Sequence, residues 1–301
     1  MGIGSGTYSN PATFLMRSRN ALITASLVVF SSIYNLLTGV KNWPLVVRVF
    51  LRTAPPSPYL IELRKSGMKL KARGIMDIWS IKETFLDRFY ERFGTHIEDG
   101  WTIVDIGGGI GDYTLFAAIA TPHGKVFAFE PFPESFALLQ QNLAANGGVA
   151  NVQAFAEAIW SQAGALKIDS TLGEPGQFIS RSANDSGGLP TEGGAFTQVP
   201  SISMADAFAR LEIDRCDLMK IDCEGAEYPI LFNTPGDVLE RVQRIVMEYH
   251  DSLTQYTHRD MQEFLASKGY AVRVVQNYVH PDLGYLYAWR VEYKPEDQSS
   301  G

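Results

Sequence analysis

The sequence predicts an α/β protein with a mostly parallel sheet, on two observations. Short apolar runs alternate with helical segments through the middle of the chain, which is typical of parallel strands joined by right-handed helical crossovers. One such run, 102–106, is followed by glycines at alternate positions, Gly107, Gly109 and Gly111. Without a Cβ, these residues can adopt positive φ and let a ligand contact the main chain at a helix N-terminus. The turn after this strand is therefore predicted to be a ligand site.

The first 75 residues are predicted to form helices and a hairpin ahead of the sheet. Asn10-Pro11 is typical of a helix start, and an apolar run occupies 21–40. A second, shorter helix is expected over 43–52. Alternating apolar and charged residues over 59–64 and 68–73 predict the hairpin.

A helix over 77–93 is predicted to follow the hairpin and to precede the α/β core. A glycine- and serine-rich stretch, 170–194, is too polar for a core, so we expect a lid or a substrate-selecting loop there. The remaining elements are predicted as strand 102–106, helix 112–120, strand 125–130, helix 133–145, strand 152–156, strand 217–222, strand 243–249, and a final antiparallel pair made of 271–275 and 285–293.

The spacing of the glycines can be compared with the known motifs that bind nucleotides. A dinucleotide fingerprint, G-x-G-x-x-G, would place Asp112 or Thr114 at its last position, where glycine or alanine is needed. A P-loop would end in Gly-Lys-Ser/Thr, and this turn does not. The spacing therefore argues against both of these phosphate-binding motifs.

The pattern that remains predicts a site for an adenosyl group. It reads D-x-G-x-G-x-G from Asp105 to Gly111, and the next apolar run ends at Glu130. A carboxylate there can accept hydrogen bonds from both ribose hydroxyls. Glu157 and Ala158 follow the third strand, at the sheet edge where adenine would lie. We expect the cofactor to be bound by Asp105, Gly107, Gly108, Gly109, Gly111, Glu130, Pro131, Glu157, Ala158 and Asp222.

A second motif lies downstream, in the run LMKIDCEGAEYPIL from Leu218 to Leu231. It resembles the K-I-D-x-E-G-A-E signature of the FkbM family of S-adenosylmethionine-dependent methyltransferases, with Cys223 at the variable position. The resemblance covers the chain from about Tyr59 to Tyr293. It implies the class I methyltransferase fold, a Rossmann-like, seven-stranded, mostly parallel sheet with a terminal antiparallel hairpin. It also implies S-adenosylmethionine as the methyl donor and a hydroxyl as the usual acceptor.

The family also has a hairpin and a helix ahead of its core. By this resemblance Trp79, Lys82 and Glu83 would lie near the mouth of the cofactor site. Ordinary packing of the helix would explain the same residues equally well.

Methyl transfer to a hydroxyl requires alignment and a base. Acceptor oxygen, methyl carbon and leaving sulfur must be in line, and the alcohol must lose its proton as the bond forms. Asp222 ends its strand, Glu224 lies in the following turn, and His250 closes the neighbouring strand. These positions lie where open α/β sheets bind ligands. Asp222 could be the base or could bind the methionine amino group and the acceptor, and Glu224 and His250 are the other candidates.

The same three side chains, Asp222, Glu224 and His250, could coordinate a divalent cation through oxygen and imidazole ligands. The acids have simpler roles in the cofactor and acceptor sites, so we expect no metal ion.

Charge and cysteine content argue against several classes of partner and site. The net charge of −7 divides into +9 for residues 1–75 and −16 for the remainder. The acidic part has no basic groove interleaved with aromatic residues, so we expect no nucleic acid partner. Cys216 and Cys223 lack the spacing of a zinc site or a disulfide framework. The expected partner is a small-molecule or glycan hydroxyl acceptor, and the oligomeric state stays open.

The apolar run 21–40 has three interpretations. A membrane span needs about 20 strongly apolar residues, and serine, threonine and asparagine interrupt this one. A signal peptide would need a convincing cleavage site, which is missing. We favour a helix that packs on the domain or on a membrane surface. We therefore expect a basic extension over 1–75, a methyltransferase domain over 76–295 and a flexible tail over 296–301, in a cytoplasmic enzyme that could be held peripherally at the inner face of the membrane.

Two other functions stay open on the sequence. One is an NAD-linked oxidoreductase on a similar sheet, against which Asp112 in place of the third fingerprint glycine argues. The other is a binding protein with a methyltransferase fold and no turnover, against which the intact Asp222 and Glu224 argue.

Overall fold

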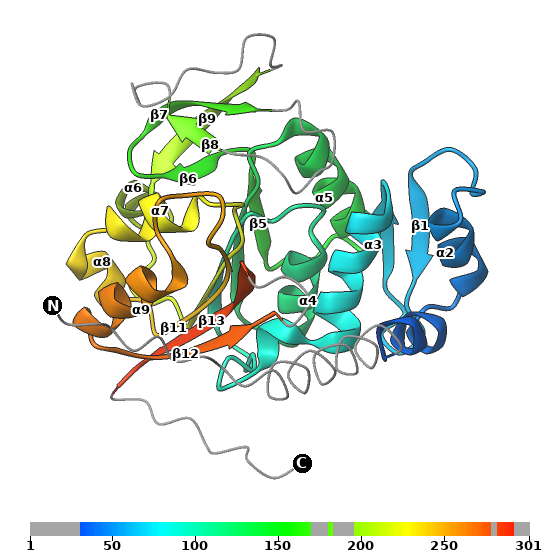
Figure 1. Cartoon of the computed structure of the whole chain (residues 1–301), viewed down its shortest axis with the longest axis horizontal. Coiled ribbons are helices and arrows are strands. Elements are labelled where there is room, and N and C mark those ends of the chain that lie inside the picture. Colours follow the sequence, from blue (N-terminus) through cyan, green and yellow to red (C-terminus); the bar gives the residue numbers. More distant parts are fainter. Residues whose placement is uncertain (1–30, 170–179, 183–195, 278–281, 292–301) are drawn as a thin grey trace, which may run out of the picture.

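The computed structural model describes residues 31–169, 180–182, 196–277 and 282–291. Its centre is a seven-stranded sheet in the order β12-β13-β11-β10-β3-β4-β5, with helices packed on both faces (Figure 1). Its strands are β3 (Thr102–Ile106), β4 (Lys125–Phe129), β5 (Val152–Phe155), β10 (Leu218–Ile221), β11 (Arg244–His250), β12 (Tyr270–Gln276) and β13 (Leu283–Arg290). The strands from β5 to β11 are parallel, and β13 is antiparallel to β11 and β12. This is the predicted fold, with the antiparallel pair at one edge.

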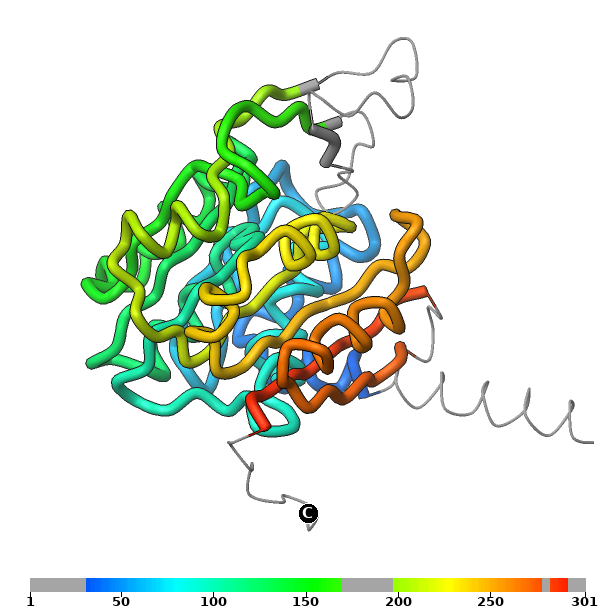
Figure 2. Tube along the Cα trace, turned by 90° about the vertical axis from the view of Figure 1, so that its left-hand side faces the viewer, coloured from blue at the N-terminus to red at the C-terminus, as the bar shows by residue number. Residues whose placement is uncertain are grey.

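The helices of the core are α4 (Asp112–Ala120), α5 (Pro133–Ala145), α6 (Met204–Arg210), α7 (Glu227–Phe232), α8 (Gly236–Glu240) and α9 (His258–Ser267). The first two coincide with the predicted ranges. Helix α4 starts after Gly111, which has a φ of 83°, and α5 starts at Pro133, whose missing N–H is not needed at the first helical position. Figure 2 shows α9 beside β12 at the edge formed by the C-terminal strands.

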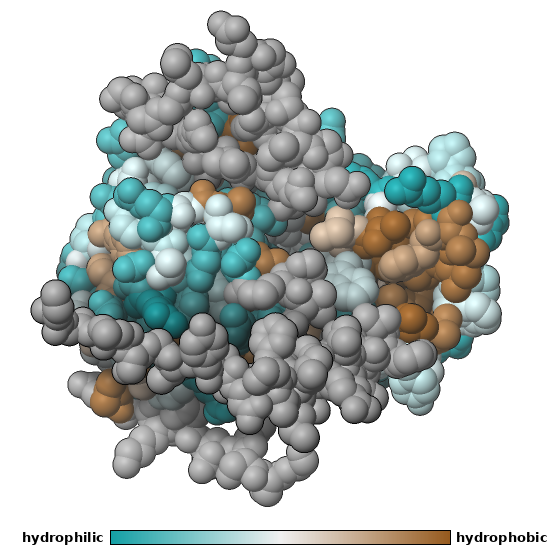
Figure 3. Space-filling model, viewed as in Figure 1, coloured by the Kyte–Doolittle hydropathy of each residue, from teal (hydrophilic) through white to brown (hydrophobic). Residues whose placement is uncertain are grey.

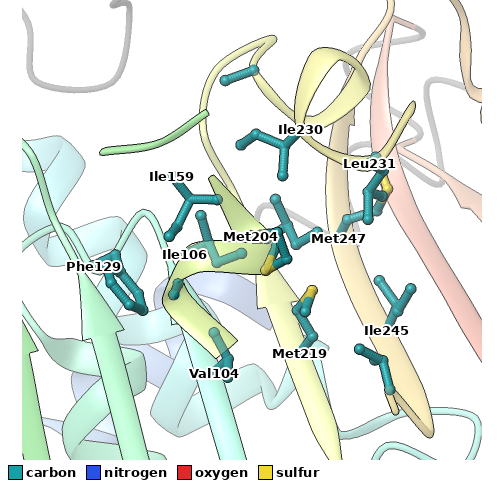
Figure 4. Packing of buried hydrophobic residues seen from close by; sticks show 14 of the residues in the cluster. Val104, Ile106, Phe129, Ile159, Met204, Met219, Ile230, Leu231, Ile245 and Met247 are labelled. Carbon is teal, nitrogen blue, oxygen red and sulfur yellow. The ribbon is translucent and has the colours of Figure 1, made fainter. Parts of the chain in front are cut away.

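Alternating side chains cover the two faces of the sheet. On one face Val104, Met219 and Ile245 are in register on adjacent strands, and they pack toward Met204 and Ile230 from the covering helices (Figure 4). On the other face Ile103, Leu218 and Val246 pack with α4 and four buried tyrosines. Lys220 and Asp222 follow Leu218 at two-residue steps, so the alternation directs them toward this second face.

The N-terminal extension has the predicted helix and hairpin. Residues 31–39 are helical and precede α2 (Trp43–Phe50); β1 (Tyr59–Glu62) pairs antiparallel with β2 (Lys69–Ala72). Asn42 does not cap α2 but bonds β1, donating to the Leu60 carbonyl at 2.6 Å and accepting from the Glu62 amide at 3.0 Å. The extension shares a hydrophobic cluster with Ile110, Leu115 and Leu138 of the core, so it is packed on the sheet domain.

The predicted helix over 77–93 is wrong in its second half. Helix α3 (Ile75–Lys82) is followed by a π-helical turn, η1 (Glu83–Asp87), and a 3-10 turn, η2 (Phe89–Glu91). Between them Arg88 has a φ of 53°, a left-handed conformation that ends a regular helix. Tertiary bonds hold the irregular backbone, because Thr84 donates to Asp112 at 2.6 Å.

The structure contains a second, smaller sheet that the sequence did not predict. Its order is β6-β9-β7-β8, with β6 (Ala158–Trp160), β7 (Gly164–Asp169), β8 (Ser180–Ser182) and β9 (Phe196–Ser203). Most of the expected loop over 170–194 lies outside the described residues, as do the helix start at Asn10-Pro11, the first half of the apolar run, and the tail over 296–301. Within the described part, no helix is long and apolar enough to cross a membrane.

Candidate active site

A cavity of about 920 Å³ lies at the carboxyl ends of the central strands. Its volume is in the range of small-molecule sites. Of the residues predicted from the sequence, it is lined by Gly107, Gly108, Gly109, Glu130, Pro131, Ala158, Asp222, Glu224 and His250. The fold therefore brings together the glycine turn, the acid after β4 and the acids after β10, which are separated by many residues in the chain.

Gly107 and Gly109 each require glycine, but for different physical reasons. Gly107 has a φ of 78°, and a Cβ there would lie 1.9 Å from the carbonyl oxygen of Asp222, so the turn packs directly on the end of β10. Gly109 has a φ of 53°, and a Cβ there would meet nothing within 4 Å. Gly109 is therefore glycine for its backbone conformation, and its surface faces the open cavity.

Glu130 is held by the backbone at both carboxylate oxygens. Its Oε2 accepts from the amide of Gly109 at 2.7 Å, and its Oε1 accepts from the amide of Phe132 at 2.8 Å. Burial raises the pKa of Glu130 to about 7, against the lowering effect of these two amides. The carboxylate is thus fixed in position beside the turn before any ligand binds.

Asp105 does not line the cavity, but it contacts Lys220, which does. Its Oδ2 accepts from the Thr114 hydroxyl at 2.6 Å, and its Oδ1 lies 3.4 Å from Lys220 Nζ. Lys220 also donates to the carbonyl of Gly107 at 2.8 Å and lies 3.7 Å from Asp222 Oδ2. Burial lowers the pKa of Lys220, but the surrounding carboxylates of Asp105 and Asp222 outweigh it and raise the pKa, so the ammonium stays charged.

Besides Asp105, two other predicted cofactor residues, Gly111 and Glu157, do not lie on the cavity wall. A Cβ at Gly111 would lie 2.9 Å from the side chain of Leu139, so this glycine permits close packing of α4 and α5. Glu157 forms an ion pair with Arg210, with hydrogen bonds of 3.1 and 2.6 Å. The structure does not bring its carboxylate to the cavity.

The three candidate catalytic residues form one cluster. Glu224 has a φ of 51°, which is strained for a residue other than glycine. Its Oε2 lies 3.3 Å from His250 Nε2. One polar atom each from Asp222, Glu224 and His250 falls within 4.8 Å of the others, close enough for a shared cation. The ion pair between Glu224 and His250 accounts for the same closeness.

A third acid, Glu227, orients His250. Its Nδ1 lies 3.4 Å from Oε1 of Glu227, a fully buried carboxylate that accepts from the amides of Cys223 at 2.7 Å and Gly225 at 2.8 Å. The second glutamate of the K-I-D-x-E-G-A-E motif is therefore a backbone-anchored support for the histidine.

Burial and charge shift the pKa values of Glu224 and His250 upward. Burial raises the pKa of Glu224 to about 8. Burial by itself lowers the pKa of His250, but the nearby carboxylates of Glu227 and Glu224 outweigh it and raise the pKa to about 10. His250 is therefore an imidazolium at neutral pH, and the nearby carboxylates are the groups able to accept a proton.

Helix α3 and the turn that follows it add residues to the cavity. Trp79 and Glu83 line it, as the family resemblance implies, while Lys82 is buried in an ion pair with Asp87 and is not on the wall. The Trp79 indole donates to Glu83 at 2.9 Å, and burial raises the pKa of Glu83 to about 7.

Glu248 and Tyr90 are among the lining residues that were not assigned a role from the sequence. Glu248 precedes His250 by two positions, so strand alternation could have indicated that both side chains face the cavity. Burial, with the charge of Asp222 next, raises the pKa of Glu248. Tyr90 donates to Asp222 Oδ2 at 3.2 Å, and it comes from the irregular turn η2, where no periodicity indicates its direction.

This strand order, with a ligand cavity at the carboxyl ends and an acid after the second strand, defines a class I methyltransferase. A family model described as the methyltransferase FkbM domain matches residues 105–272, more than half of the chain. The chain belongs to the FkbM family of methyltransferases, and S-adenosylmethionine is its methyl donor.

Three relatives illustrate the spread of the family. Methyltransferase 1 of Beauveria bassiana is 28% identical over 67% of this chain and 84% of its own length. The 31-O-demethyl-FK506 methyltransferase FkbM of Streptomyces tacrolimicus is 26% identical over 56% of this chain and 73% of its own. The hexuronic acid methyltransferase AglP of Haloferax volcanii is 24% identical over 64% of this chain and 75% of its own.

Proposed function

We propose that this enzyme is an O-methyltransferase for a neutral hydroxyl of a sugar, a glycan or glycolipid, or a polyketide-like small molecule. The observation that carries the proposal is the cluster of Asp222, Glu224 and His250 at the end of the cavity away from Glu130. An alcohol needs a base as it is methylated, and this cluster supplies carboxylates next to the cofactor turn.

In this proposal the cofactor occupies the side of the cavity nearest β4. Glu130 accepts hydrogen bonds from the ribose hydroxyls, the bare backbone of Gly107 to Gly109 contacts the methionine part, and Pro131 and Ala158 border the adenine. Asp105 contributes by holding Lys220, which in turn positions the turn and Asp222.

The acceptor then lies over the ends of β10 and β11. Asp222 is the first candidate for the base and also for a ligand of the methionine amino group, and Glu224 is the second candidate for the base. His250, already protonated and fixed by Glu227, positions Glu224 and balances part of the negative charge.

The charge at this end of the cavity favours a neutral acceptor. Glu83, Asp222, Glu224 and Glu248 line it together, and those that are ionised would repel an anionic acceptor in a partly desolvated site. The name of the Streptomyces relative specifies methylation at oxygen, which supports an oxygen acceptor here. The name of the Haloferax relative specifies a hexuronic acid, which the carboxylates around this cavity disfavour.

The test is to incubate cell extracts with S-adenosylmethionine carrying a labelled methyl group and to identify the product by mass spectrometry. We expect the label in a methyl ether, in reactions with the native chain and not with a double variant, Asp222→Asn with Glu224→Gln. Label on an amine or on a carboxylate would contradict the proposal. Calorimetry with adenosylhomocysteine and with NADH separates it from the oxidoreductase alternative, since only the first should bind.

A further inference from the structure

The N-terminal extension exposes a group of large apolar side chains. Of the large hydrophobic residues exposed in the described part, most fall between residues 33 and 76, and Figure 3 shows hydrophobic surface gathered on this module. We define the apolar patch as Ile33, Tyr34, Leu37, Trp43, Phe50, Leu51 and Leu60. The other exposed large hydrophobics are Met76, Ile119, Tyr256 and Val291. Such a concentration on one module indicates an interaction surface.

Helix α2 has one broad apolar stripe, of which only one edge is buried. Val46 and Val49 are buried against the extension. Trp43 and Phe50 are seven residues apart and lie beside Val46 on the outer edge of the same stripe, and Leu51 follows at the end of the helix. Trp43 and Phe50 are each 40% exposed and Leu51 is 68% exposed. Packing within the described chain does not account for this exposed edge.

Basic side chains surround the patch, and the acidic domain does not neutralise them. Residues 31–75 contain one acid, Glu62, which pairs with Lys41, while Arg73 pairs with Asp77 of the following helix. The other basic residues of this range, which form no ion pair with an acid in the described chain, are Arg48, Arg52, Arg64, Lys65, Lys69 and Lys71.

We propose that this face docks on the surface of an anionic lipid bilayer. Trp43, Phe50 and Leu51 would enter the interfacial region, where aromatic and aliphatic side chains of amphipathic helices bind. Arg48 lies in the last turn of α2 and Arg52 just past its end, and both would contact acidic headgroups, each strengthening binding by about fivefold. The apolar and basic parts of the surface thus fit the same partner.

A second copy of the chain fits this surface less well. A two-fold contact would place the same patch on both subunits and bring their basic residues together. Like charges across such an interface are unfavourable. Lipid, in contrast, offers an apolar layer beneath a negatively charged one.

Docking in this way has a consequence for the cavity. Ile75, Met76 and Trp79 line it and follow directly after β2, and Met76 is 49% exposed. One wall of the cavity therefore begins where the docking module ends, which suits an acceptor at or near a membrane. Lipid binding itself needs no turnover, so this proposal stands or falls independently of the proposed function.

The experiment is vesicle flotation of the full chain, with phosphatidylcholine vesicles and with vesicles that also contain phosphatidylglycerol. We expect flotation with the mixed vesicles at low salt, weaker flotation at high salt, and little with phosphatidylcholine alone. A triple variant, Trp43→Ser, Phe50→Ser and Leu51→Ser, should reduce the bound fraction at least tenfold. Its matched control, Ile119→Ser with Tyr256→Ser, changes exposed apolar residues elsewhere and should float like the native chain.

The charge contribution is tested with Arg48→Gln and Arg52→Gln, matched by Lys125→Gln and Arg259→Gln on the rest of the surface. The first pair should weaken flotation by roughly tenfold or more, and the second should not. Circular dichroism and binding of adenosylhomocysteine verify that each variant is folded.

Three outcomes would overturn the proposal. The native chain could fail to float on the mixed vesicles at low salt, or the triple variant could float as well as the native chain. A native dimer that the triple variant converts to a monomer, without any lipid binding, would assign the patch to a second copy instead.

Discussion

The two sides of the cavity are built by different means. On the β4 side, both oxygens of Glu130 are fixed by backbone amides of Gly109 and Phe132. On the β10–β11 side, Asp222 and Glu224 are positioned mainly by other charged side chains, Lys220 and His250. Backbone anchoring gives a rigid surface for a constant ligand, whereas a cluster of interacting acids gives groups whose protonation can change.

Backbone strain also differs between the two sides of the cavity. The glycine turn reaches left-handed φ values with residues that tolerate them, Gly107 and Gly109. The β10 turn reaches a φ of 51° with Glu224, at an energetic cost that the surrounding structure must offset. We therefore expect changes on the β4 side to affect cofactor affinity and changes on the β10 side to affect turnover.

The largest effect is expected for the acids of the β10 side. Asp222→Asn and Glu224→Gln keep the shape of the side chain and remove its basicity, so at least one should lose turnover by about 10² to 10⁴-fold. In at least one of the two variants, binding of adenosylhomocysteine should change much less, because Glu130 and the glycine turn hold much of the cofactor on the other side. Rates with labelled S-adenosylmethionine and calorimetry test this, with the exposed Asp237→Asn as the control. Near-native rates for both variants would place the base elsewhere.

On the β4 side, Glu130→Ala should weaken adenosylhomocysteine binding by about 1.5–3 kcal/mol, the scale of lost charge-assisted hydrogen bonds. Turnover at saturating cofactor should fall less than affinity does. Calorimetry gives the difference, and Glu134→Ala, an exposed acid on α5, is the matched control. An unchanged dissociation constant would remove Glu130 from the cofactor site.

The pH profile distinguishes the two candidate bases. If Glu224 is the base, kcat/KM should rise about tenfold per pH unit below its pKa of about 8 and then level off, because only the deprotonated form accepts the proton. The rate should fall again near pH 10, where His250 loses the proton that fixes Glu224. Glu224→Gln should remove the rising limb. A native profile that is flat between pH 7 and 9 would contradict Glu224 as the base.

The smallest effect is expected for Tyr90→Phe. This change deletes one hydroxyl that donates to Asp222 Oδ2 at 3.2 Å, so kcat/KM should fall by the equivalent of about 0.5–1.5 kcal/mol. Thermal stability should change little, because the ring and its contacts remain. Tyr256→Phe, at a partly exposed position outside the cavity, provides the comparison. A loss as large as that of Asp222→Asn would give Tyr90 a direct part in the reaction.

The sequence by itself determined the parts of the fold that depend on local pattern. The ranges of β3, α4 and α5 agree with prediction, because short-range periodicity, glycine and proline decide where such elements begin and end. The same holds for the position of Glu130 after its strand and for the motif from Lys220 to Glu227. A strand end needs no long-range information to be recognised.

Tertiary structure alone decided which of these residues meet. Tyr90 reaches Asp222 across 132 positions from a turn without periodicity, and Glu157 turns to Arg210 rather than to the cavity. The irregular path after Lys82 and the small sheet of β6 to β9 likewise depend on contacts between distant segments. Such contacts join residues that are far apart in the sequence, and packing and charge in the folded chain determine them. Patterns among neighbouring residues therefore cannot predict them.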